Sequence, residues 1–216
     1  VILDPTTPEG LDAMADLFKR AREVNPGTRL YVNEYDVLSG DKLDEYIELI
    51  KQLLERGAPI DGIGVQGHMW DWSFASIDDI HTSLEKLSEL GIPIKITEFD
   101  VSAEAVAKHL APVGASPEEV EEIRAQYIQD VLTLFYGCPA VVGINLWSFD
   151  ARLNWRLRDG EQAGLYDDDM QPNQSGRELE ALYTDQWRTH EQAVADERGE
   201  IRFRGFPGEY SVQPSA

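Results

Sequence analysis

The residue best placed for chemistry is Glu98, a carboxylate that directly follows a short β-branched run. The run at residues 94–97 comes after Gly91-Ile92-Pro93, and an apolar run between a helical segment and a loop predicts a buried parallel strand. In a β/α barrel the carboxyl ends of the strands form the active site, so a carboxylate there is a candidate for catalysis. The simpler alternative is that Glu98 only begins a polar loop.

Two further titratable side chains fall where they can support Glu98. His68 follows the end of a neighbouring predicted strand, where it can donate a hydrogen bond to the carboxylate. Asp100 lies two residues after Glu98, which places it on the same side of the strand, and it can orient the His68 ring. A carboxylate that hydrogen-bond donors keep ionised can act as a nucleophile. Alternatively, His68 is a core histidine with satisfied hydrogen bonds.

Neutral amides and tryptophans complete a set that is typical of a sugar site. Asn33 and Gln66 also lie at strand ends, and their amides suit the hydroxyl groups of a carbohydrate. Trp147 and Trp155 offer flat apolar faces on which sugar rings can stack, although Trp147 alone also fits a role in the core. No G-x-G-x-x-G, P-loop or G-x-S-x-G motif occurs, so the sequence predicts no cofactor.

Composition limits the kinds of molecule that the chain can bind. The chain has 216 residues and a formal net charge of −21, which disfavours binding to the phosphate backbone of a nucleic acid. No apolar run is long enough to cross a bilayer, and the four histidines show no metal-ligand spacing. The single cysteine, Cys138, fits a small buried side chain. The chain opens at Val1 with neither an initiator Met nor a leader, which is compatible with a start inside a longer or processed polypeptide.

Helical and strand patterns alternate along the chain. A helix opened by Thr7-Pro8 is followed by four strand–helix units, with strands at 30–35, 60–66, 94–100 and 140–147 and helices at about 41–56, 77–90, 117–136 and 176–187. This alternation predicts an α/β fold with a parallel sheet and right-handed crossovers. Residues 1–190 are assigned to this domain, and residues 191–216 form a tail with a predicted β-hairpin at 200–212.

Four strands are too few to close a barrel, which needs eight strands and roughly 250 residues. The sheet is therefore either open with bare edges, or the other half of a barrel is missing from this sequence or supplied by another chain. Two copies of this chain closing one barrel is one such arrangement. Bare strand edges promote association, so we expect poor solubility or dimerisation of the piece by itself.

Five segments resemble motifs of the C-terminal half of family-10 glycoside hydrolases, the endo-β-1,4-xylanase family. The match covers roughly residues 5–187, and the tail resembles a C-terminal extension on some bacterial members. The matching segments are Y-V-N-E-Y at 31–35, G-I-G-V-Q-G-H at 62–68, I-T-E-F-D at 96–100, the pair Trp147 and Trp155-Arg156, and G-L-Y-D-D-D-M-Q-P at 164–172.

The resemblance implies a (β/α)8 TIM-barrel type of fold of which only the last four β/α units are present. It implies hydrolysis of β-1,4-xylosidic bonds in xylan by a retaining double-displacement mechanism, with no cofactor and with a polysaccharide partner. A secreted, extracellular or periplasmic location is also implied. The implied site has Glu98 as nucleophile, its supports His68 and Asp100, and the sugar-lining residues Asn33, Gln66, Trp147 and Trp155.

The retaining mechanism also needs an acid/base carboxyl group. In the family that Glu follows an Asn at the end of the fourth strand, which we expect upstream of this chain. Glu34 is a weaker candidate, because its strand matches the family's fifth and the motif usually carries Asp there. A competing hypothesis is a non-catalytic carbohydrate- or partner-binding half-barrel that kept the tryptophans and lost the acid.

Overall fold

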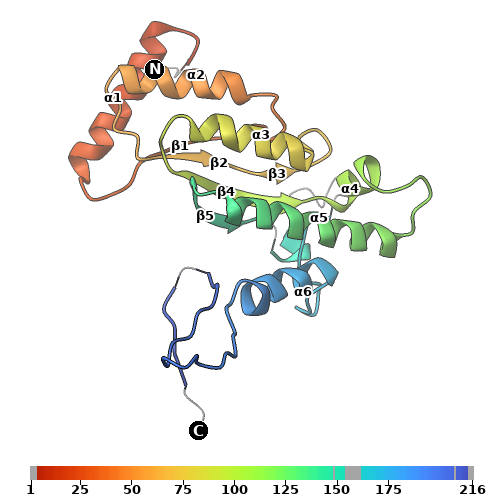
Figure 1. Cartoon of the computed structure of the whole chain (residues 1–216). Helices are drawn as coiled ribbons and strands as arrows, with labels where there is room; N and C mark the ends of the chain where they lie inside the picture. The colour runs from red at the N-terminus through yellow and green to blue at the C-terminus, as the bar shows by residue number, and fades with distance from the viewer. Residues whose placement is uncertain (1–3, 148, 154–161, 207, 214–216) are drawn as a thin grey trace.

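The structure, a computed structural model, describes residues 4–147, 149–153, 162–206 and 208–213. Its elements, shown in Figure 1, alternate in the predicted order. They are α1 (Pro8–Val24), β1 (Tyr31–Glu34), α2 (Leu43–Glu55), β2 (Gly62–Val65), β3 (His68–Met69), α3 (Ile77–Ser88), β4 (Ile94–Val101), α4 (Ala103–His109), α5 (Pro117–Gly137), β5 (Val141–Leu146), a 3-10 turn (Ala151–Leu153), α6 (Gln174–Ala181) and a π-helical turn (Leu182–Gln186).

The four longer strands form one parallel sheet in the order β1-β2-β4-β5. Its register places Tyr31 beside Gly62 and Ile63 beside Ile94, while Ile94 in turn faces Val141. The two-residue strand β3 pairs with the far end of β4. These four strands lie in the sheet in chain order, and a helix follows each of them along the chain. This is the predicted run of β/α units.

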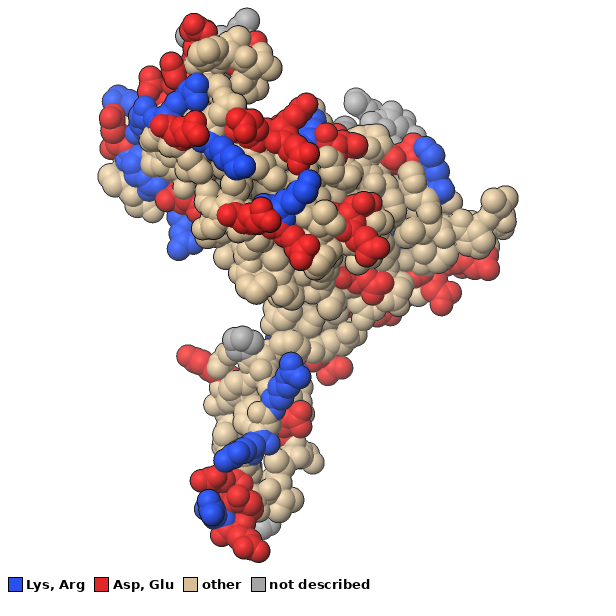
Figure 2. Space-filling model, turned by 45° about the horizontal axis from the view of Figure 1, so that its top comes forward, with Lys and Arg blue, Asp and Glu red and all other residues tan. Residues whose placement is uncertain are grey.

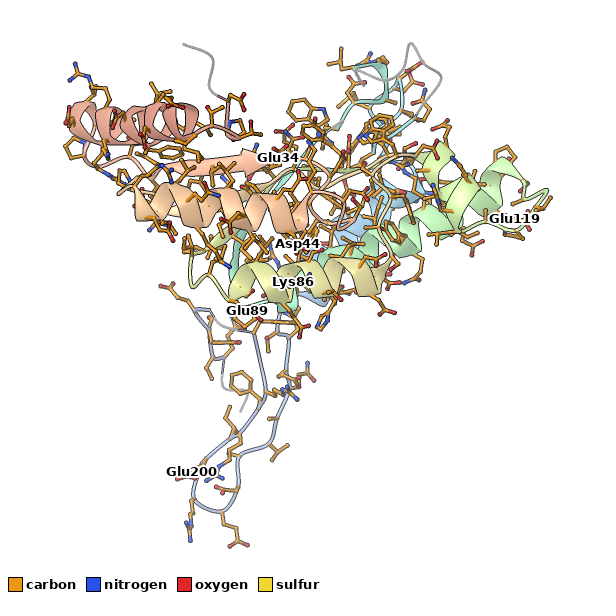
Figure 3. The ribbon with its side chains drawn as sticks, turned by 90° about the horizontal axis from the view of Figure 1, so that it is seen from above. Glu34, Asp44, Lys86, Glu89, Glu119 and Glu200 are labelled. Carbon is orange, nitrogen blue, oxygen red and sulfur yellow. The ribbon has the colours of Figure 1, made fainter. Side chains whose placement is uncertain are left out.

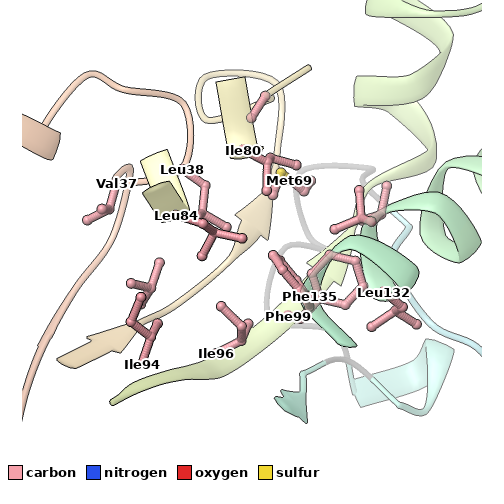
Figure 4. Close-up of a cluster of buried hydrophobic side chains, with 14 of the residues drawn as sticks. Val37, Leu38, Met69, Ile80, Leu84, Ile94, Ile96, Phe99, Leu132 and Phe135 are labelled. Atoms are coloured by element: carbon pink, nitrogen blue, oxygen red, sulfur yellow. The ribbon is translucent and has the colours of Figure 1, made fainter. Parts of the chain in front are cut away.

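The core lies between the sheet and the helices of successive units. The ring of Phe99 in β4 meets that of Phe135 in α5 edge-on at 5.5 Å, and Ile96 of β4 belongs to the same buried cluster (Figure 4). Leu84 of α3 joins the same fully buried cluster. Each such side chain contributes roughly 1.5–3 kcal/mol through burial, so this cluster fixes the position of β4 and of the carboxylates at its end.

Three helices, α1, α3 and α5, begin where the capping residues predict. Thr7 accepts a hydrogen bond from the first turn of α1, which has Pro at its first position. Ser76 and Asp79 form the predicted capping box at α3, and Ser116 and Glu119 form another at α5.

The structure differs from the sequence prediction in a few elements. The strand β3, the helix α4 and the 3-10 turn at Ala151–Leu153 were not predicted. The predicted β-hairpin at 200–212 is wrong, because the described residues of this segment contain no strand. Side-chain contacts hold the tail instead: the Tyr210 hydroxyl bonds to the Phe206 carbonyl and lies 3.3 Å from Thr189 Oγ1. Gly205 and Gly208 disfavour a regular strand there.

The surface carries an acidic excess, and red side chains outnumber blue ones over much of the face in Figure 2. The tail extends away from the α/β body in Figures 1 and 2. Among the residues that the structure describes, no helix combines the length and apolar character required to cross a membrane.

Candidate active site

Glu98 and Asp100 project from β4 toward His68 of β3. The Glu98 Oε2 lies 3.3 Å from Nε2 of His68, and the Asp100 Oδ1 lies 2.7 Å from Nδ1 of the same ring. The pairing of β3 with β4 places His68 directly beside Asp100. Because alternate residues of a strand share one side, both carboxylates reach the imidazole. The predicted chain of Glu98, His68 and Asp100 is therefore present.

Burial and nearby negative charge shift the pKa of His68 in opposite directions. Its side chain is 13% exposed, while that of Asp100 is 1% exposed. Burial by itself lowers the pKa of His68, but the hydrogen bond and charge of Asp100, together with the charge of Glu98, outweigh it and raise that pKa above its ordinary value. The imidazole is thus biased toward a protonated ring that donates to both carboxylates.

Asn33 of β1 supplies a second donor to Glu98 from two strands away in the sheet. Its Nδ2 lies 3.5 Å from the Glu98 Oε1, a long hydrogen bond. The hydroxyl of Thr97 donates to the Asn33 Oδ1 at 3.0 Å. This contact directs the amide nitrogen of Asn33 toward Glu98, a role for Thr97 that the sequence reading missed. The contact joins residues 64 positions apart in the sequence, so no local sequence signal identifies it.

Gln66 reaches the site through its backbone. Its carbonyl accepts the backbone N–H of Glu98 at 2.8 Å, and its side chain is half-buried. The next residue, Gly67, has φ +83°, and a Cβ there would lie 2.9 Å from a methyl group of Ile96. Glycine is therefore required for the turn that leads from β2 into His68. That the Gln66 side chain contacts a sugar stays a prediction.

Trp147 lies beside His68 at the end of β5. Its backbone N–H donates to the Phe99 carbonyl at 2.8 Å, and the residue is 44% exposed. The centroid of its ring lies 6.0 Å from that of His68, with the two planes nearly perpendicular. An exposed indole in this position is not a core residue, so it remains available to a ligand. Trp155 lies outside the described residues.

Glu34 has local partners of its own at the end of β1 (Figure 3). Its Oε1 accepts the backbone N–H of Tyr35 at 2.9 Å and lies 3.3 Å from the Lys42 ammonium, which also sits over the Tyr35 ring. Lys42 and the Tyr35 backbone thus hold this carboxylate at the end of the strand. The geometry therefore gives Glu34 no special suitability as the acid/base residue.

The arrangement suits nucleophilic chemistry by a carboxylate. Glu98 has a side chain 23% exposed, two donors aimed at its two oxygens, and an exposed indole nearby. Such a group can attack an electrophilic carbon while remaining oriented. Within the described ranges, no cluster of three or more His, Cys, Asp or Glu side chains could hold a metal ion.

Comparison with known proteins places this site in a family. The sequence profile of glycosyl hydrolase family 10 matches residues 8–179. Endo-1,4-beta-xylanase 1 of Arabidopsis thaliana is 34% identical over 209 residues, which cover 94% of this chain and 20% of that protein. Anti-sigma-I factor RsgI6 of Acetivibrio thermocellus is 32% identical over 198 residues, covering 91% of this chain and 23% of that protein.

Solved structures agree with this placement. Xylanase 10B from Thermotoga petrophila RKU-1, crystallised in complex with xylobiose, superposes with a TM-score of 0.70 at 26% identity, covering 82% of this chain and 53% of that chain. The chain thus spans about half of that structure and about a fifth of the two curated relatives. The predicted fold, a partial (β/α)8 barrel, is confirmed. The chain belongs to glycosyl hydrolase family 10.

Proposed function

We propose that this chain forms the C-terminal half of a barrel that hydrolyses β-1,4-xylosidic bonds in xylan with retention of configuration. The observation that carries the proposal is the position of Glu98 between two donors, His68 at 3.3 Å and Asn33 at 3.5 Å, at the carboxyl edge of the sheet. The similarity to a xylanase crystallised with xylobiose supports this substrate class. The buried carboxylate of Asp100 fixes the ring that holds Glu98.

In this mechanism a Glu98 oxygen attacks the anomeric carbon of the scissile xylose and forms a covalent glycosyl-enzyme. The bond to the leaving oxygen breaks as an acid/base carboxyl group protonates that oxygen. Water, deprotonated by the same carboxyl group, then attacks the anomeric carbon and releases Glu98 as a carboxylate. Two inversions give net retention, and the second carboxyl group must lie about 5–5.5 Å from Glu98.

We assign the second carboxyl group to polypeptide outside this sequence. Glu34 does not fit the role, because its oxygen is paired with Lys42 and the Tyr35 backbone. In the proposed site Asn33 and Gln66 hydrogen-bond sugar hydroxyls, while Trp147 and Trp155 stack on sugar rings. Figure 3 shows Glu34 at the end of β1.

A substrate that needs no acid assistance tests the proposal in this chain. Dinitrophenyl β-xylobioside carries a leaving group that departs without protonation, so the nucleophile alone can drive its release. We expect one equivalent of dinitrophenol per chain in an initial burst, and none from Glu98→Gln. Binding of xylobiose by the wild type without any burst would contradict the nucleophile assignment and favour a non-catalytic sugar-binding half-barrel.

A further inference from the structure

A chain of two hydrogen bonds runs from the Thr97 hydroxyl through the Asn33 amide to Glu98. The Thr97 Oγ1 lies 3.0 Å from the Asn33 Oδ1, and the Asn33 Nδ2 lies 3.5 Å from the Glu98 Oε1. Thr97 and Glu98 are neighbours on β4, whereas Asn33 lies on β1, two strands away in the sheet. The two β4 residues are therefore linked through a side chain of a different strand.

The chemistry of the three groups fixes the direction of these hydrogen bonds. An ionised carboxylate accepts hydrogen bonds and cannot donate them, so Glu98 faces the NH2 end of the Asn33 amide. The carbonyl end of the same amide then faces Thr97, whose hydroxyl donates to it. Donation to an amide oxygen polarises the amide and strengthens the hydrogen bond that its nitrogen gives. The Thr97 hydroxyl thus supports the donor that Glu98 receives.

Asn33 has little other support. The residue is exposed, and within the part of the chain that the structure describes its side-chain amide hydrogen-bonds to Thr97 and Glu98 alone. Gly64 lies beside it in the parallel register, and a Cβ at that position would lie 2.6 Å from the Asn33 Oδ1. Glycine at position 64 therefore leaves the space that the amide occupies. Without the Thr97 hydroxyl, the Asn33 amide is expected to turn toward water.

We propose that Thr97 is a positioning residue for the nucleophile, because its hydroxyl holds the Asn33 amide against Glu98. This inference rests on the proposed function and adds to it a residue that acts through Asn33 rather than on the reacting atoms. His68 lies 3.3 Å from one oxygen of Glu98, and Asn33 orients the other oxygen. When Asn33 moves away, the carboxylate is held at one oxygen only and is aligned less often with the anomeric carbon, which slows its attack.

The test is a double-mutant cycle on the rate of the dinitrophenol burst from dinitrophenyl β-xylobioside, followed by stopped-flow absorbance. Thr97→Val keeps the shape of the side chain and removes the hydroxyl, so we expect the burst to be about tenfold slower. Asn33→Ala should slow the burst at least as much. Adding Thr97→Val to Asn33→Ala should slow it no further, because Thr97 acts through Asn33. Thr97→Ser retains the hydroxyl and should stay within about twofold of the wild type.

Further measurements distinguish positioning from a general effect on folding or binding. In Thr97→Val the melting temperature should be unchanged, and the Kd for xylobiose should stay within about twofold of the wild type. The NMR signals of the Asn33 side-chain NH2 group should shift in Thr97→Val and return in Thr97→Ser. Thr82→Val is the matched control, because the exposed Thr82 hydroxyl donates to the Asp78 carbonyl within α3, and its burst rate should equal that of the wild type.

The outcomes separate this inference from the proposed function. A Thr97→Val burst as fast as that of the wild type, or unchanged Asn33 NH2 signals, would overturn the inference and leave the role of Glu98 intact. The inference also fails if the two substitutions slow the burst independently, or if Thr97→Ser is as slow as Thr97→Val. A wild type that shows no burst would overturn the proposed function and this inference together.

Discussion

Replacing Asp100 by Asn is the most informative perturbation of the Glu98–His68–Asp100 chain. The Asp100 side chain is 1% exposed, and its oxygen lies 2.7 Å from the His68 Nδ1. Asn preserves the shape and the acceptor but removes the charge. Burial, which lowers the pKa of His68, is then opposed by Glu98 alone. We therefore expect the pKa of His68 to fall in Asp100→Asn.

The loss of stability expected in Asp100→Asn is larger at low pH than at high pH. A hydrogen bond to a charged group contributes about 1.5–3 kcal/mol, so the free energy of unfolding should drop by about that amount near pH 5.5. The folded-state pKa of His68 is raised above its ordinary value of 6.5. The stabilisation from protonated His68 is therefore complete below that value and is lost as pH rises through the folded-state pKa. The difference between variant and wild type should shrink toward pH 9.

Two measurements check this reasoning. The first is an NMR titration of the His68 ring, assigned with a His68→Gln variant, and the second is urea unfolding at about pH 5.5 and pH 9. Glu85→Gln is the matched control, because it removes a carboxylate 3.6 Å from the exposed His81. An unchanged or raised His68 pKa in Asp100→Asn, or a larger stability loss at pH 9 than at pH 5.5, would refute the account.

Three further substitutions probe the supports of the site. Arg124→Met should lower the free energy of unfolding by about 3 kcal/mol, because the buried guanidinium donates to three backbone carbonyls near the end of β4. Urea unfolding measures this loss, and a loss under about 1 kcal/mol would contradict the expectation. Tyr46→Phe should lower the free energy of unfolding by about 1–2 kcal/mol, because the Tyr46 hydroxyl lies 2.9 and 2.8 Å from carbonyls of β1 and β2. An unchanged free energy of unfolding would show that these contacts are weak. Glu34→Gln should leave the dinitrophenol burst within twofold of the wild type, whereas a large loss would identify Glu34 as a catalytic participant.

Local sequence signals predicted most of the fold. The capping residues Ser76 and Ser116 marked helix starts that the structure reproduces, and the β-branched run of β4 marked the strand that carries Glu98. The two-residue strand β3 escaped detection because it is too short to show a period. The helix α4 was missed because its seven residues form barely two turns, although Ser102 caps it.

The core of the site was predicted from residue type and strand position, but its long-range contacts were not. The approach of His68 to both carboxylates follows from strand ends meeting at one edge of a parallel sheet. The contact of Thr97 with Asn33 and the pairing of Glu34 with Lys42 depend on side-chain geometry that no local pattern encodes. The hairpin prediction failed because alternating apolar residues in the tail indicated a strand while side-chain contacts gave a different arrangement.

The central claim is that Glu98 forms a covalent bond to the sugar. A deoxyfluoro xylobioside with a dinitrophenyl leaving group slows release of the glycosyl-enzyme, so the adduct can be located by peptide mass spectrometry. We expect a single fluoroxylobiosyl group on the peptide that contains Glu98, and no such group in Glu98→Gln. An adduct on another carboxylate, or an unmodified chain that nevertheless binds xylobiose, would contradict it.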